Sequence, residues 1–183
     1  KIDIFVYVLG EGPRVSLEAC TLEAWDQAQA CGAGDALAQT QAAVDQMENG
    51  GVILFVSTIH DEKPTGSRPL EAIQAGALLM LMNEAVAEYG RLGIRVNMLE
   101  LGALTGDEER LGGPLTALYD TLETKLPLGR AGRPEDAVEP ALMLCSDGAS
   151  FIHGARLRVD GGFLSYYGDG DSQKRRDYGR AHR

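Results

Sequence analysis

The chain has 183 residues, of which 44% are hydrophobic and 24% charged, and its formal net charge is -10 at pH 7. This length suits one domain with a sizeable core, and the acidic balance disfavours a nucleic-acid-binding protein. We expect no membrane-spanning segment and no apolar leader before the first strand, and therefore a cytoplasmic protein.

The cysteines and histidines do not predict a metal site. Cys20, Cys31 and Cys145 are an odd number without metal-ligand spacing, so we expect free thiols rather than disulfide bridges. His153 has no Cys, His or carboxylate at metal spacing beside it, and we interpret it as a turn residue.

The first third of the chain reads as a strand, a turn and a helix. Residues 1–10 are mostly apolar, which predicts a strand buried on both faces. The turn Gly10-Glu11-Gly12-Pro13 lacks the third glycine and the strand-to-helix setting of a phosphate-binding loop. An alanine-rich helix is predicted from Thr21 to about Met47, with Gly32 and Gly34 weakening its middle.

The centre of the chain predicts a strand, a helix and a second strand. An apolar run from Gly51 to Thr58 is too short for a helix, and helical spacing then runs from about Pro69 to Tyr89. Residues 93–97 read as the next short strand, so the unit is a right-handed crossover between parallel strands. The middle of the helix is apolar all round, which predicts that its outer face is also covered.

The last part of the chain predicts a helix, a strand and a tail. Pro134 suits a first helical turn, Pro140 should kink or restart that helix, and residues 155–159 read as a final strand. The tail 163–183 holds aromatic and basic side chains. It is either a partly disordered terminus or a segment that lies on a partner subunit or near its acidic substrate.

Five stretches stand in the order and spacing of one known family: GGVILFVST, EAVAEYGRLGIRVNMLELG, LPLGRAGRPEDA, MLCSDGASFIHG and LRVDGG. From Ile2 to about Gly162 the chain resembles the C-terminal two-thirds of the classical short-chain dehydrogenase/reductase (SDR) family. The resemblance implies an α/β fold with a doubly wound, Rossmann-like parallel sheet, in which the N-terminal dinucleotide-binding βαβ unit is missing or unseen. Residues 1–162 would form this truncated domain and 163–183 a C-terminal extension.

The family's four catalytic positions are altered in this chain. Glu71 and Ala75 stand where the resemblance places the catalytic Tyr and Lys. Thr58, with Ser57 beside it, stands in the place of the catalytic Ser, and Gly32 in that of the Asn. A Tyr acts as proton acceptor in the family because an adjacent ammonium lowers its pKa, and Ala75 offers no such group. We therefore predict no catalytic, cofactor-binding or metal-binding residue.

The family's cofactor contacts are also weakened. Its strand ending in Asn-Asn-Ala-Gly here ends in Tyr7-Val8-Leu9-Gly10, with bulky side chains near the place of the nicotinamide ribose. The threonine that would touch the carboxamide is one place early, at Thr105. The resemblance implies that this chain binds no cofactor and that NAD(H) belongs to a partner subunit.

These expectations lead to one main hypothesis. The chain would be a non-catalytic (pseudoenzyme) subunit of an NAD-dependent short-chain alcohol dehydrogenase. It would pair with an active SDR subunit, as a heterotetramer, through helices 21–47 and 69–89. It would be comparable in kind to the inactive subunit of 2-[hydroxy(phenyl)methyl]succinyl-CoA dehydrogenase, with an active subunit that oxidises a hydroxyacyl-CoA.

Other functions stay open at this point. One is an active SDR oxidoreductase whose cofactor-binding N-terminal half is not in the chain, and another is a ligand-sensing or regulatory protein on the same frame. The apolar face of the second helix would alternatively serve as a hydrophobic substrate groove. A serine hydrolase built from Ser57, His60 and Asp61 is disfavoured, because residues so close in sequence do not easily align as nucleophile, base and orienter.

Overall fold

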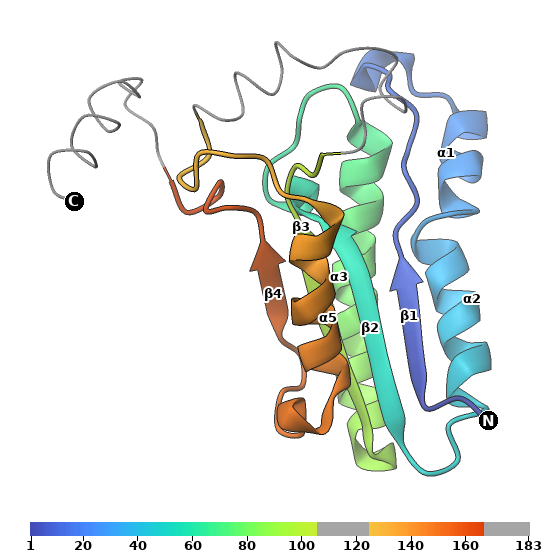
Figure 1. Ribbon diagram of the computed structural model, residues 1–183. Helices are drawn as coiled ribbons and strands as arrows, with labels where there is room; N and C mark the ends of the chain where they lie inside the picture. The colour runs from blue at the N-terminus through green and yellow to red at the C-terminus, as the bar shows by residue number, and fades with distance from the viewer. Residues whose placement is uncertain (106–124, 167–183) are drawn as a thin grey trace, which may run out of the picture.

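The computed structural model describes residues 1–105 and 125–166 (Figure 1). Its helices and strands are β1 (Ile4–Val8), α1 (Leu22–Gln29), α2 (Ala33–Val44), β2 (Gly51–Thr58), α3 (Pro69–Tyr89), β3 (Ile94–Leu101), α5 (Val138–Cys145) and β4 (Arg156–Val159). The segment 107–124, which the SDR resemblance aligns with the family's substrate lid, and the basic residues of the tail lie outside the described residues.

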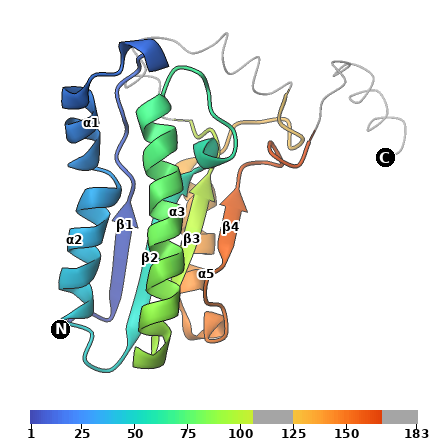
Figure 2. The same cartoon turned by 180° about the vertical axis from the view of Figure 1, so that it is seen from behind.

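The described strands form one parallel sheet in the order β1-β2-β3-β4. Helices α1, α2 and α3 cover one face, and α5 covers the other over β2 and β3 (Figures 1 and 2). The predicted α/β class with a parallel sheet is therefore confirmed.

Strands β2 and β3 are buried because both of their faces are covered. Ile53 and Phe55 of β2 pack in one core cluster with Leu78 of α3. Leu54 points to the opposite face, where it packs with Leu144 of α5. Alternate residues of a strand face opposite sides, so a nearly continuous apolar run is what this double packing requires.

The prediction that the first strand is buried on both faces is wrong. Tyr7 is buried on the α2 and α3 side, but the side chains of Ile4, Val6 and Val8 are 50%, 47% and 64% exposed. These three lie on the α5 side of the sheet, and within the described chain no helix covers β1 there (Figure 1). Apolar composition alone did not reveal that β1 is an edge strand of the described sheet.

The predicted helix from Thr21 to Met47 is two helices, α1 and α2, separated at Gly32. The break is fixed from two sides. The Tyr7 hydroxyl donates to the Gly32 carbonyl at 2.8 Å, and the Ala33 N–H donates to Gln74 Oε1 at 2.9 Å. A Cβ at Gly32 would lie 2.6 Å from the backbone carbonyl oxygen of Ala28 and 2.4 Å from Gln74 Oε1, so the break favours glycine there.

Helix α3 begins and ends where the sequence predicted. The expectation that no segment is long and apolar enough to span a membrane needs correction at this helix. Together with the turn that follows, Pro69–Leu92 is long and apolar enough by length and composition to cross a membrane. In the fold, however, Leu78, Met82 and Ala85 are buried in the core beside the sheet, so α3 is the core helix of this domain. Core helices of soluble proteins pass the same composition test.

The end of the sheet farthest from the strand carboxyl ends is held by hydrogen bonds. The buried Asn97 amide donates to the Ile152 carbonyl and accepts from the Ala155 N–H, both at 2.9 Å. The Arg95 guanidinium donates to the Leu144 carbonyl at 2.9 Å and the Ser146 carbonyl at 3.0 Å, which ties the end of α5 to β3. The residues Arg95 and Asn97, which lie in one of the stretches that resemble the family, thus stabilise the fold.

His153 is a structural turn residue, as predicted. Its Nδ1 accepts from the Val96 N–H at 3.0 Å, and its Nε2 lies 3.0 Å from the Val86 carbonyl. Since Nδ1 is an acceptor, Nε2 carries the proton and donates to that carbonyl. The ring therefore links the turn before β4 to both β3 and α3.

The C-terminal helix follows the predicted restart. Pro134–Ala137 forms a short 3-10 turn, and Pro140 lies in the first turn of α5, where a missing N–H costs little. Before that turn, the Asp136 carboxylate accepts from the Arg130 guanidinium at 2.6 and 2.9 Å and from the Arg133 N–H at 2.7 Å. Arg130 with Asp136 thus fixes the entry into α5.

Candidate functional site

A cavity of about 960 Å³ opens at the carboxyl ends of the strands, where ligands bind in open parallel α/β sheets. Its walls come from the ends of β1, β2 and β3, the first turn of α3 and the loop between β2 and α3. Ionisable and polar side chains that line it include Glu11, Arg14, Ser57, His60, Lys63 and Glu71. This pocket contains three of the sequence-predicted positions, namely Glu71, Thr58 and Ser57.

Glu71, in the place of the family's Tyr, is tied to its neighbours. Its carboxylate is buried in the first turn of α3 and accepts from Arg68 Nη1 at 2.8 Å. His60 Nε2 lies 3.7 Å from its other oxygen, and Glu11 approaches the same Arg68 nitrogen at 3.8 Å. Glu71 is therefore already engaged by the Arg68 guanidinium, with the His60 ring beside it.

Ala75, in the place of the family's Lys, offers no group that would tune a proton acceptor. It is fully buried against the core, one turn after Glu71. The other tyrosine in this region, Tyr7, does not replace the missing phenol. Its hydroxyl is engaged with Gly32 and Asp35, and burial followed by the Asp35 charge raises its pKa well above the usual value.

The two hydroxyl residues at the end of β2 face opposite ways. Ser57 shares the strand face of Ile53 and Phe55, which pack on the α3 side, whereas Thr58 is one residue out of that alternation. Ser57 therefore lies on the same side of the sheet as Glu71. Both residues line the pocket, so Thr58, which the resemblance puts in the place of the family's Ser, lies at the site together with Ser57.

Gly32, in the place of the family's catalytic Asn, has a role in packing. The gap beside Gly32 is filled by Gln74, whose Oε1 caps the start of α2 while its Nε2 is buried without a hydrogen-bond partner among the described residues. Sequence reasoning missed Gln74 and Arg68. Their spacing of three residues on either side of Glu71 is the signal that would have placed all three on one helix face.

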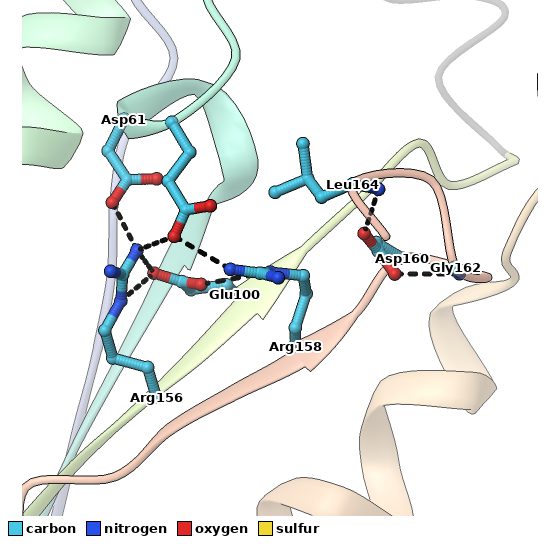
Figure 3. Close-up of polar contacts among 8 residues, drawn as sticks. Asp61, Glu100, Arg156, Arg158, Asp160, Gly162 and Leu164 are labelled. Carbon is cyan, nitrogen blue, oxygen red and sulfur yellow. Dashed lines mark hydrogen bonds and ion pairs between the residues drawn. The ribbon is translucent and has the colours of Figure 1, made fainter. Parts of the chain in front are cut away.

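An ionic network holds the loop between β2 and α3 against the edge of the sheet (Figure 3). Arg156 of β4 donates to Glu100 Oε1 through Nε at 2.6 Å and to Asp61 Oδ2 through Nη2 at 2.6 Å. Burial raises the pKa of Glu100, and the hydrogen bond from Arg156 opposes that rise. Because Asp61 is adjacent to His60, the network positions the wall of the pocket.

The same contacts exclude the serine-hydrolase arrangement. Asp61 is engaged by Arg156 rather than by His60, and His60 Nδ1 lies 3.2 Å from the Lys63 carbonyl. The structure thus does not bring Ser57, His60 and Asp61 together as nucleophile, base and orienter.

Metal ligands and thiols show no further site in the described part of the chain. Within residues 1–105 and 125–166, no group of three or more His, Cys, Asp or Glu is placed to hold a metal ion. Cys20, Cys31 and Cys145 are free, and burial raises the pKa of the Cys145 thiol.

Two parts of this chain differ from the contacts that the family resemblance implies for a nicotinamide dinucleotide. Val8 and Leu9, at the end of β1, line the pocket in the place of the family's Asn-Asn-Ala-Gly. Ala75 also lacks the ammonium that would orient a ribose. We derive no chemical step through that cofactor on this chain.

A match to a family model decides the relationship. Residues 1–164 match the model described as "Enoyl-(Acyl carrier protein) reductase". The chain belongs to the short-chain dehydrogenase/reductase family. The SDR chain is 34% identical over 129 residues to L-rhamnose-1-dehydrogenase of Scheffersomyces stipitis, covering 68% of this chain and 49% of the relative. It is 29% identical over 172 residues to 3beta-hydroxysteroid dehydrogenase 1 of Eggerthella lenta, and this match covers 91% of the chain and 65% of the relative.

A solved structure shows the same fold. The gluconate 5-dehydrogenase from Burkholderia cenocepacia J2315, in complex with NADP and tartrate, matches with a TM-score of 0.84 and 26% identity. The match covers 91% of this chain and 66% of that structure's chain. The SDR chain thus spans between about half and two-thirds of the length of these proteins.

Proposed function

We propose that this SDR chain is a non-catalytic subunit of an NAD-dependent short-chain oxidoreductase. The observation that carries the proposal is what Glu71 and Ala75, at the positions of the family's catalytic Tyr and Lys, contact in the fold. Glu71 is buried and bound by Arg68, and Ala75 is a buried methyl group. A proton acceptor for hydride transfer needs a neighbouring group that sets its pKa, and Ala75 supplies none, while the only carboxylate at these positions is held by Arg68.

The partner in this proposal is an active SDR subunit that holds NAD(H). Association would use helices α1 to α3, since Leu37 of α2 and Ile73 and Met80 of α3 are exposed apolar side chains on that face. A contiguous apolar surface formed by these side chains would be typical of an interaction site. The assembly would be a heterotetramer of a soluble, cytoplasmic type, and its substrate a hydroxyacyl-CoA.

An active oxidoreductase is the second candidate, favoured by two observations. The named relatives are dehydrogenases, and the pocket keeps a buried hydroxyl, Ser57, beside a carboxylate, Glu71. In this candidate Glu71 would accept the proton, after exchanging its contact with Arg68 for one with the substrate. The cofactor-binding half would lie outside this chain.

Native mass spectrometry of the full-length protein, isolated untagged from its own source, separates the two candidates. The proposal predicts an equimolar complex with an unlike, dehydrogenase-like chain. The complex would then be assayed for NAD- and NADP-dependent turnover with L-rhamnose, a 3β-hydroxysteroid and gluconate, the compound classes named for its relatives. A homo-oligomer that turns over any of these alcohols would contradict the proposal and support the active enzyme.

A further inference from the structure

We propose that the pocket at the strand ends binds a hydroxy acid, meaning an amphipathic carboxylate with a hydroxyl or carbonyl oxygen on its carbon chain. The inference deepens the proposed function and rests on it, because it names the ligand class of a pocket that we propose has lost hydride transfer. Three independent properties of the lining support this ligand class: an unpartnered hydroxyl, two cationic side chains and an apolar wall.

Ser57 supplies the first argument. The residue is among those that line the pocket and is only 5% exposed, and its buried Oγ has no hydrogen-bond partner among the described residues. Buried hydroxyl groups in folded proteins are nearly always paired, since an unpaired one costs about 1–3 kcal/mol. A ligand oxygen in the pocket would provide the partner that the described chain does not.

The cationic side chains supply the second argument. Arg68 is neutralised by Glu71 and Glu11, but Lys63 and Arg14 form no ion pair with a carboxylate among the residues described. Lys63 instead holds its ammonium 4.7 Å above the Phe163 ring at the pocket wall. A chain with net charge -10 therefore presents unneutralised positive charge at this cavity, and a carboxylate is the group that it attracts.

The apolar wall supplies the third argument. Leu101 and Leu104 at the end of β3 and beyond, Leu126 and Phe163 line the same cavity. They would enclose a hydrocarbon chain whose carboxylate meets Lys63 and Arg14 and whose oxygen meets Ser57. A purely polar ligand, such as free phosphate, would leave this wall in contact with water.

Calorimetric titration of the full-length protein with three matched probes tests the inference. The probes are 3-hydroxyoctanoate, octane-1,3-diol without the carboxylate and octanoate without the hydroxyl. Because a charge-assisted contact is stronger than a neutral one, the diol should bind about 10-fold more weakly than the hydroxy acid, and octanoate roughly 3- to 10-fold more weakly.

Variants assign these differences to the named side chains. Lys63→Gln should weaken 3-hydroxyoctanoate about 10-fold and leave the diol unchanged, because only the carboxylate contact is lost. Ser57→Ala should weaken the two hydroxylated probes and leave octanoate unchanged, with no loss of stability because the removed hydroxyl has no partner in the described part of the chain. Arg91→Gln, at the far end of α3, is the control and should change nothing.

Equal affinities for the hydroxy acid and the diol, or no binding of any probe at millimolar concentration, would overturn the inference. The proposed function fails on a different readout, a homo-oligomer with turnover. If a homo-oligomer both bound the hydroxy acid and turned over alcohols, the proposed ligand class would stand. The proposed non-catalytic role would be rejected.

Discussion

The two ends of the sheet differ in what their polar side chains do. At the end where β3 begins, Asn97, Arg95 and His153 each satisfy backbone groups of a neighbouring segment. At the strand carboxyl ends, Ser57 and Gln74 keep buried polar atoms without partners among the described residues, and Glu71 is shared between two basic groups.

This difference separates stability from function within one fold. Ligands of parallel α/β sheets bind outside the carboxyl ends of the strands, and the opposite end serves folding. The chain keeps the scaffold end complete while the family's reactive groups at the pocket end are replaced. Of these residues Ser57 lines the pocket, and its hydroxyl, unpaired within the described part of the chain, is the polar group that a ligand could engage without hydride transfer.

The largest expected effect is at the scaffold end. Asn97→Ala removes two buried hydrogen bonds and leaves the Ile152 carbonyl and the Ala155 N–H unpaired, so the free energy of unfolding should fall by roughly 2–4 kcal/mol. Urea denaturation measures the change. Asn83→Ala, on the exposed side of α3, is the control and should stay within about 0.5 kcal/mol of the wild type. Equal losses of stability in the two variants would show that the hydrogen bonds of Asn97 do not stabilise the fold.

The next effect tests the break between α1 and α2. Gly32→Ala places a Cβ 2.4 Å from Gln74 Oε1 and 2.6 Å from the Ala28 carbonyl, which should destabilise the fold by roughly 1–3 kcal/mol. Gly76→Ala, with nothing within 4 Å of the added Cβ, should instead stabilise α3 by about 0.5–1 kcal/mol. Thermal unfolding of both variants compares them, and the same sign of change in both would contradict this packing.

A smaller effect is expected at the pocket end. Glu71→Gln keeps a hydrogen-bond acceptor for Arg68 but removes its charge, so unfolding should become easier by about 1–2 kcal/mol. Glu84→Gln, on the exposed part of the same helix, should have almost no effect. If Glu71→Gln raised stability instead, the carboxylate would be strained by its surroundings, as expected of a reactive group rather than of a settled ion pair.

The smallest effect concerns pH. Arg130 and the Arg133 N–H hold the pKa of Asp136 at about 2, below its usual 3.8. A lowered folded-state pKa adds stability above the usual value, and that stability is lost as pH falls from about 4 to about 2. Asp136→Asn should therefore lower the melting temperature at pH 7, with the difference from wild type closing by pH 2. A difference that persists at pH 2 would show that charge is not its cause.

Much of the scaffold could be predicted because local pattern and packing agree. The bounds of β2 and α3 follow from an apolar run and from helical spacing with Pro69 at the first position, and both match the structure. The break at Gly32 could not be predicted, since it depends on Tyr7 and Gln74, which lie far from it in sequence. The exposure of β1 was also missed, because apolar composition does not state which face a helix covers.

The pocket was only partly predictable. The family spacing placed Glu71 and Ala75 correctly on the buried face of α3. Thr58, in the place of the family's Ser, lines the pocket as Ser57 does, and strand alternation puts Ser57 on the α3 side. The engagement of Glu71 by Arg68 and His60 depends on rotamers and loop position, which sequence spacing does not determine. The loss of the Tyr and Lys pair was visible in the sequence, and the geometry supplies the reason why no neighbouring residue replaces it.

The cofactor stoichiometry of the full-length protein tests the central claim most directly. Equilibrium dialysis of the intact assembly with NAD and NADP counts the bound dinucleotide per copy of this chain. The account predicts that this chain contributes no site, so that one dinucleotide is bound per pair of unlike subunits. One dinucleotide per copy of this chain would contradict the account and return the protein to the active dehydrogenases.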